Sequence, residues 1–251
     1  MKELIVFIFG ACIGSFANVC IYRIPIKLSI IIPRSFCVQC RHPIPFYYNL
    51  PILSYIFLKG CCAFCKKKIS PKYFIVELLL AVFALLLFNN FQLTLVTAYW
   101  FVFICVLIVI SFIDIEHRII PDIISLPCIL LFSTSFYFLP EINIMDIIVG
   151  VLGGATILFS ISFLYYHTRN QVGIGGGDIK LLMMIGAAQG IKGVLFTIVV
   201  GSLLGVIGSL LFIANKKTIN LKLEIPFAPF LSMATILYIF YGNKIIQWYL
   251  N

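Results

Sequence analysis

Long apolar runs dominate the sequence and restrict the chain to a membrane fold. A helix that spans a bilayer needs about 20 predominantly apolar residues. Only 11% of the 251 residues are charged, whereas a typical soluble domain has about 25%. We therefore expect an all-α, polytopic membrane protein with about eight transmembrane helices. The runs cover approximately 4–24, 73–88, 93–113, 123–139, 147–166, 179–188, 194–214 and 227–249.

The distribution of Lys and Arg predicts how these helices are oriented, because cytoplasmic loops carry an excess of both. Placing the polar insert 25–72 in the cytoplasm leaves only Lys2, Lys192 and Lys244 outside. The short sixth run is needed, since without it the basic residues of 216–222 would lie on the wrong side. The net charge of +9 therefore indicates orientation, and we expect no nucleic-acid partner. The basic residues on the cytoplasmic side are Arg23, Lys27, Arg34, Arg41, Lys59, Lys66, Lys67, Lys68, Lys72, Arg118, Arg169, Lys180, Lys216, Lys217 and Lys222.

Two cysteine pairs lie in the insert between the first two apolar runs. The pairs are Cys37-Val-Gln-Cys40 and Cys62-Ala-Phe-Cys65, a spacing typical of a tetrahedral four-cysteine zinc site. A segment of this length buries little core, so a bound Zn²⁺ would supply folding energy. Disulfides are the alternative, which the reducing cytoplasm disfavours. Cys61 could replace Cys62, but it would give a less typical spacing.

Two aspartates lie at the edges of apolar runs. Asp114 ends the third run, and Asp178 follows the glycines of Gly173-Ile-Gly-Gly-Gly177 directly before the sixth. The charge distribution places both at the cytoplasmic edge of the membrane. Taken singly, Asp114 is explained as a solvated residue at a helix end. Asp178, like Asp122 after Pro121, is explained as a helix N-cap.

Taken together, Asp114 and Asp178 predict a different role. Two carboxylates at the same depth could converge between helices and share a proton, so that one acts as a base on water while the other donates to a carbonyl oxygen. This is aspartic-protease chemistry, and it needs no cofactor. The glycines before Asp178 would allow a substrate strand to approach the backbone closely.

The sequence resembles the bacterial type IV prepilin peptidases along nearly its whole length. Residues 14–25 read Gly-Ser-Phe-Ala-Asn-Val-Cys-Ile-Tyr-Arg-Ile-Pro, similar to the family's N-terminal signature, and the cysteine pairs have the family's spacing. Segments 49–55 and 73–77 are similar to its sequences beside the second pair. Asp114-x6-Pro121-Asp122 and Gly175-Gly-Gly-Asp178-Ile-Lys180 resemble its two aspartate motifs. The second contains the G-x-G-D motif shared with presenilin-like intramembrane proteases.

This resemblance implies an intramembrane aspartic endopeptidase of the bacterial inner (cytoplasmic) membrane, with its active site facing the cytoplasm. It would cut the basic leader peptide of prepilins or pseudopilins after a glycine. It would then methylate the new N-terminal residue with S-adenosylmethionine. Asp122 would cap the helix that follows Pro121 and orient the site, and it is the alternative catalytic acid. The catalytic residues implied are Asp114 and Asp178, with Asp122, Gly175, Gly177 and Lys180 in support.

The methyl-donor site has no glycine-rich motif of soluble methyltransferases to mark it. It would have to be built from the N-terminal region, where Asn18, Arg23 and Glu77 are candidate polar liners. Alternatively, Asn18 makes an interhelical hydrogen bond, while Arg23 and Glu77 extend their charged ends to the membrane interface.

The predicted organisation is an N-terminal region, 1–92, that includes the cysteine insert, followed by a membrane-embedded peptidase domain, 93–251. Two other functions stay open. One is a peptidase that has lost methylation. The other is a transporter with a regulatory zinc unit, which would place acids near mid-bilayer and show an inverted repeat. The sequence shows neither feature.

Overall fold

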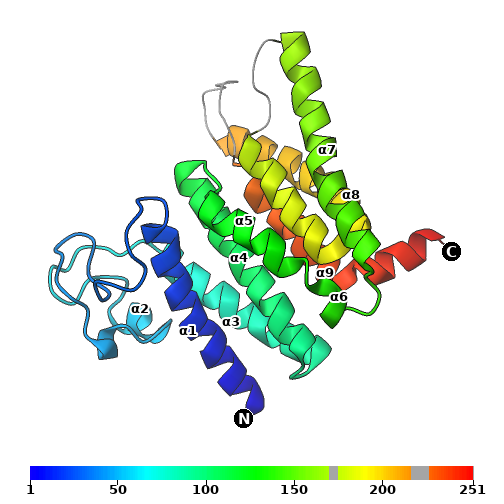
Figure 1. The fold of residues 1–251 in the computed structure, drawn as a ribbon. Coiled ribbons are helices and arrows are strands. Elements are labelled where there is room, and N and C mark those ends of the chain that lie inside the picture. Colours follow the sequence, from blue (N-terminus) through cyan, green and yellow to red (C-terminus); the bar gives the residue numbers. More distant parts are fainter. Residues whose placement is uncertain (170–174, 216–225, 251) are drawn as a thin grey trace. The chain divides into compact units, whose positions relative to one another are not determined.

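The computed structural model describes residues 1–169, 175–215 and 226–250, and these ranges form an all-α fold (Figure 1). Gly173, Lys216, Lys217 and Lys222 lie outside the described residues. Within the described ranges, five helices are long and apolar enough to cross a membrane. They are α1 (Lys2–Arg23), α3 (Lys72–Phe91), α4 (Leu95–His117), α7 (Ile144–Arg169) and α8 (Gly176–Asn215). The shorter or less apolar elements are η1 (Phe46–Tyr48), α2 (Leu53–Phe57), α5 (Asp122–Phe132), α6 (Ser135–Phe138) and α9 (Ala228–Leu250).

The chain divides into two compact units, 1–109 and 110–251. In the first unit, α1 and α3 pack antiparallel through two glycines of α1. A Cβ at Gly10 would lie 2.7 Å from the Leu80 carbonyl oxygen, and one at Gly14 would lie 2.6 Å from the Glu77 Cα. Larger residues would therefore separate the helices, which explains the Gly-x-x-x-Gly spacing.

In the second unit, α8 packs against α7 and α9 and bends sharply at Gly190, where φ is 66°. The ψ of Gly190 is −172°, and this combination of φ and ψ is adopted almost only by glycine. The start of α8 and its second part, around Gly205, both lie near the start of α9: Asp178 interacts with Asp114, Asp114 accepts a hydrogen bond from Ala228, and Gly205 lies against Phe227. A straight helix would separate residues 178 and 205 by about 40 Å, so the chain turns back.

These elements differ from the predicted runs in two places. The sixth and seventh runs are the two parts of α8, on either side of Gly190. The fourth run, 123–139, is divided into α5 and α6. The side chains of Ser133 and Thr134 donate to the carbonyls of Ile129 and Leu131, at 2.8 and 2.6 Å, and such local bonds compete with helix continuation.

Candidate functional site

Asp114 lies in the last turn of α4 and is 7% exposed. Its Oδ2 accepts a hydrogen bond of 3.1 Å from the backbone N–H of Ala228, the first residue of α9. The first N–H groups of a helix have no partner within the helix and favour a negative charge. The N-terminus of α9 therefore holds the Asp114 carboxyl in one orientation.

The contribution of α9 was not predicted from the sequence. Two prolines, Pro226 and Pro229, flank the start of this helix, and proline is common in the first turn of helices. That pattern marks the helix start. It does not indicate that Ala228 would lie beside an aspartate 114 residues away in the chain.

Asp178 lies in the first turn of α8, which begins at Gly176. It is therefore the third residue of the helix and not its N-cap, and its backbone N–H donates to the Gly175 carbonyl at 3.1 Å. Its carboxyl interacts electrostatically with that of Asp114. The structure thus brings the two predicted carboxylates from α4 and α8 into one neighbourhood.

Gly177 allows α8 to approach the segment between α4 and α5. A Cβ at Gly177 would lie 2.9 Å from the Cβ of Ile120, which is buried. Any side chain would therefore push the first turn of α8 away from this segment. Gly175 is exposed, and a Cβ there would lie 3.8 Å from Oδ2 of Asp178. A side chain at 175 would border that carboxylate.

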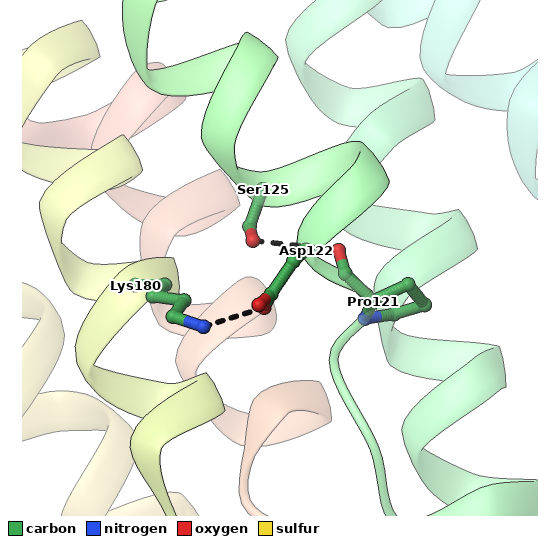
Figure 2. A network of polar contacts seen from close by, with 4 residues as sticks. All are labelled: Pro121, Asp122, Ser125 and Lys180. Carbon is green, nitrogen blue, oxygen red and sulfur yellow. Dashed lines mark hydrogen bonds and ion pairs between the residues drawn. The ribbon is translucent and has the colours of Figure 1, made fainter.

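Asp122 and Lys180 form an ion pair that joins α5 to α8 (Figure 2). Asp122 is the first residue of α5, and Pro121 occupies the N-cap position. The Lys180 Nζ lies 2.5 Å from the Asp122 Oδ1. Lys180 lies two residues after Asp178, near the start of α8. The Asp122 side chain therefore restrains the start of α8 through Lys180, and it does so without occupying the predicted cap position.

The four predicted metal ligands form one cluster in the insert. The Sγ atoms of Cys37, Cys40, Cys62 and Cys65 all lie within 4.8 Å of one another, and Cys37 and Cys65 are 4.0 Å apart. Tetrahedral Zn–S bonds of about 2.3 Å place sulfurs about 3.8 Å apart, so the cluster could hold a metal ion. All nine cysteines are free thiols, so the structure shows no disulfide in the insert.

The two cysteine pairs have the same backbone geometry. After each pair the next residue, Arg41 or Lys66, has a φ of 57°. Its N–H donates to the carbonyl of the first cysteine, Cys37 or Cys62, at 2.8 and 3.0 Å. Cys61 lies outside the cluster, and its thiol contacts the Lys59 carbonyl at 3.7 Å. The cluster that could hold a metal ion therefore contains Cys62 and not Cys61.

The Cys62 thiol of the cluster ionises more readily than an ordinary cysteine. Hydrogen bonds from the backbone N–H groups of Cys65 and Phe64 lower the pKa of the Cys62 thiol to about 7, against the opposing effect of desolvation. Thiolates and not thiols bind metals. The fold of the second pair therefore favours the ligating form near neutral pH.

A cavity of about 710 Å³ in the first unit is lined by Asn18, Arg23 and Glu77. Asn18 donates to the Tyr73 carbonyl at 2.9 Å, and the Glu77 Oε2 accepts from the Ile52 N–H at 2.7 Å. The Arg23 guanidinium is buried and donates to backbone carbonyls of the loop that follows α1. The structure brings the three predicted residues to one cavity, and each also has a role in folding.

Comparison with known proteins identifies two family matches. Residues 8–91 match the bacterial peptidase A24 N-terminal domain, and residues 101–210 match the type IV leader peptidase family. No solved structure matches the chain.

Among the relatives are proteins named prepilin leader peptidase/N-methyltransferase from three bacteria. That of Aeromonas salmonicida (strain A449) is 31% identical, covering 98% of this chain and 93% of the relative. The protein of Dichelobacter nodosus is 31% identical, with 96% and 92% covered. That of Legionella pneumophila is 30% identical, with 99% and 94% covered. The chain is therefore a multi-pass membrane protein that belongs to the type IV leader peptidase (peptidase A24) family.

Proposed function

We propose that the chain cleaves the leader peptide from prepilins or pseudopilins and then methylates the new N-terminal residue. The observation that carries the peptidase half is the interaction of Asp114 with Asp178 at the ends of two apolar helices. The relatives, named for both activities, support the combination.

In the proposed cleavage, Asp114 and Asp178 share one proton. The ionised carboxylate takes a proton from water while the water oxygen bonds to the scissile carbonyl carbon. The protonated carboxyl gives its proton to the carbonyl oxygen. The tetrahedral intermediate then collapses and the C–N bond breaks. The leaving amine takes the proton held by the carboxyl that acted as base, and the carboxylate that gave its proton takes one from the gem-diol hydroxyl as the carbonyl re-forms. The hydrogen bond from the Ala228 N–H would hold the Asp114 carboxyl in an orientation suited to sharing a proton with Asp178.

We further propose eight membrane segments, in which α8 contributes two on either side of Gly190 and the α5–α6 pair and α9 contribute one each. This arrangement keeps the predicted charge distribution and places both aspartates on the cytoplasmic face of the inner membrane. The proposed functional division is an N-terminal region, 1–92, and a peptidase domain, 93–251.

The Asp122–Lys180 pair is proposed to position Asp178 and not to react. Asp122→Asn and Lys180→Met are each expected to slow cleavage up to about fivefold, because the pair is partly exposed and such pairs contribute about 0–1 kcal/mol. The Asp122 side chain is 59% exposed and the Lys180 side chain is 33% exposed. Cleavage rates of both single variants and the double variant test this. A double variant no slower than either single one is the expected result, and independent, multiplying losses would contradict it.

The methyl donor is proposed to occupy the cavity of the first unit. A cavity of about 710 Å³ lies within the range for small-molecule sites. S-adenosylmethionine supplies an electrophilic methyl group on a sulfonium. Glu77 carries the negative charge that attracts this cation, and the stacked rings of Tyr55 and Phe74, whose centroids are 5.4 Å apart, line the same cavity and offer cation–π contact. Asn18 would contact the methyl donor, while Arg23 would hold the loop that forms part of the cavity wall.

Glu77→Gln is expected to reduce methylation about 10- to 100-fold, because hydrogen bonds and contacts to a charged group contribute about 1.5–3 kcal/mol. The amide oxygen can still accept from Ile52, so the fold is expected to persist. Transfer of label from S-adenosylmethionine to a cleaved pilin measures the effect. Glu3→Gln, the same change in the first turn of α1 and away from the cavity lining, is the control. Methylation by the Glu77→Gln variant at the wild-type rate would show that Glu77 does not belong to the donor site.

Mass spectrometry of a prepilin incubated with the purified chain tests the whole proposal. Loss of the leader after a glycine, followed by the gain of one methyl group when S-adenosylmethionine is present, is the expected result. Cleavage without methylation would identify a peptidase that lacks the second activity. An intact prepilin would reject the peptidase half, and a cleaved pilin that gains no methyl group would reject the other.

A further inference from the structure

We propose that a groove beside the end of α1 binds an anionic phospholipid of the leaflet in which α1 ends. The groove has a volume of about 550 Å³. One wall is apolar and includes Phe16 and Val19 of α1, and the opposite side is formed by the insert. The insert residues that matter here are Ile31, Phe46 and Arg34.

The loop that forms one side of the groove is folded around Arg23. The guanidinium donates to the carbonyl oxygens of Ser29 and Pro33, each at 2.8 Å, and lies over the Phe36 ring at 5.6 Å. The Ser29 Oγ accepts from the N–H of Ile31 at 3.3 Å. Because these bonds fix the backbone of the loop toward Arg23, the loop presents its isoleucines outward.

The outward side chains are strongly apolar. Ile31 is 80% exposed, Ile32 is 73% exposed and Phe46 is 84% exposed. Burying a side chain of this kind contributes about 1.5–3 kcal/mol, so leaving them in water would be costly. Three such residues next to a membrane-spanning helix indicate that lipid covers them.

The position of the groove along α1 supports the same conclusion. Phe16 lies seven residues before Arg23, the last residue of the helix, which is about 10 Å along the axis. Phe16 is half-exposed and belongs to the apolar part of the span. The groove therefore extends from the depth of acyl chains, at Phe16, to the level of headgroups, at Arg34.

The charge of the insert selects the kind of lipid. Eight basic residues and no Asp or Glu lie between residues 24 and 72. Basic segments next to a membrane helix attract anionic headgroups. Arg34 is exposed and lies at the groove, so its guanidinium can pair with a phosphate. A basic leader peptide would be repelled by the same charges, which argues against the leader as the occupant.

Native mass spectrometry of the full chain in detergent tests the proposal, with phosphatidylglycerol and phosphatidylcholine of identical acyl chains as probes. The chain is expected to retain phosphatidylglycerol more tightly. Arg34→Gln should weaken phosphatidylglycerol binding about fivefold, since one basic residue contributes about 1 kcal/mol at an anionic surface. It should weaken phosphatidylcholine binding less, because the choline cation of that headgroup offsets the charge of its phosphate. Phe46→Ala should weaken the binding of both lipids.

Lys66→Gln is the matched control, because Lys66 is exposed, belongs to the same insert and does not line the groove. It should retain wild-type lipid binding. An unchanged metal content and circular dichroism spectrum would show that each variant is folded. Equal retention of the two lipids by the wild type, or equal losses at Arg34 and Lys66, would overturn the proposal. Displacement of the bound lipid by a prepilin would assign the groove to the substrate and would overturn it as well.

Discussion

Asp114→Asn and Asp178→Asn are each expected to lower the rate of leader cleavage by roughly 10³-fold, within the range that a positioned general acid or base contributes. The amide of asparagine resembles the carboxyl in shape, so the hydrogen bond from Ala228 to residue 114 can persist. What is lost is the ability to take or give a proton. Mass spectrometry of prepilin over time measures the rate.

The two losses are expected not to add, because both residues act in one proton-sharing unit. The double variant should be about as slow as either single variant. Asp146→Asn is the control: Asp146 lies in the first turn of α7, where its Oδ2 accepts from the Asn143 N–H at 3.0 Å, and asparagine can also accept there. A normal rate in either the Asp114 or the Asp178 variant would show that the catalytic assignment is wrong. A loss at Asp122 as large as these would make Asp122 the catalytic acid instead.

Cys37→Ser is expected to remove the metal from the insert and to unfold it. We propose that the wild-type chain holds about one Zn²⁺ per molecule, and structural zinc supplies about 10–16 kcal/mol of apparent binding energy near neutral pH. The insert buries few of its own side chains, Cys62 at 6% exposure being one of them. Metal analysis and limited proteolysis of the purified protein measure the two effects.

Cys61→Ser provides the matched control for this prediction. Cys61 is adjacent to Cys62 but lies outside the cluster, so its variant should keep the metal and resist proteolysis. Metal in the Cys37 variant, or its loss from the Cys61 variant, would contradict the ligand assignment. Full peptidase and methylation activity of a metal-free protein would show that the role of the cluster is restricted to folding the insert.

The pH dependence of metal binding follows from the cluster. Zinc binds thiolates, and the pKa of the Cys62 thiol is lowered to about 7. Against the opposing backbone hydrogen bond from His42, desolvation and hydrogen bonds with the other three thiols raise the pKa of the Cys40 thiol to about 11. Zinc affinity should therefore fall steadily as the pH is lowered, and more steeply below about 7, where Cys62 is protonated as well and the insert should loosen. Raising the pH should restore both, because the thiolate becomes the main form again.

Several parts of the site could be predicted from the sequence because their signals are local. The two cysteine pairs fix which sulfurs can converge, since each pair lies within one short turn. Asp114 and Asp178 stand at the ends of apolar runs, and the pattern of Lys and Arg predicts a common depth for them. Two glycines of α1, one helical turn apart, also allow a close helix contact, although the sequence does not indicate that α3 is the partner.

The remaining features depended on which distant segments pack together. The sharp bend of α8 lies at Gly190, where the helix contacts Asp146 and Gly150 of α7. The sequence there predicts only that the apolar run is interrupted. The Ala228 N–H reaches Asp114 across 114 residues, and Lys180 reaches Asp122 across 58. Arg23 carries the same charge whether it contacts a ligand or holds a loop.

An all-α membrane protein, the four cysteines that can hold a metal and the two aspartates proposed to react were all predictable from the amino-acid sequence. Hydrophobic length, ligand spacing and charge asymmetry are properties of short segments, and they can be evaluated without coordinates. The packing of distant segments was needed to show that a helix N-terminus orients Asp114, that an ion pair restrains the start of α8, and that Arg23 folds the loop beside the groove at the end of α1. These contacts join residues whose separation in space is set by packing, which no local pattern specifies.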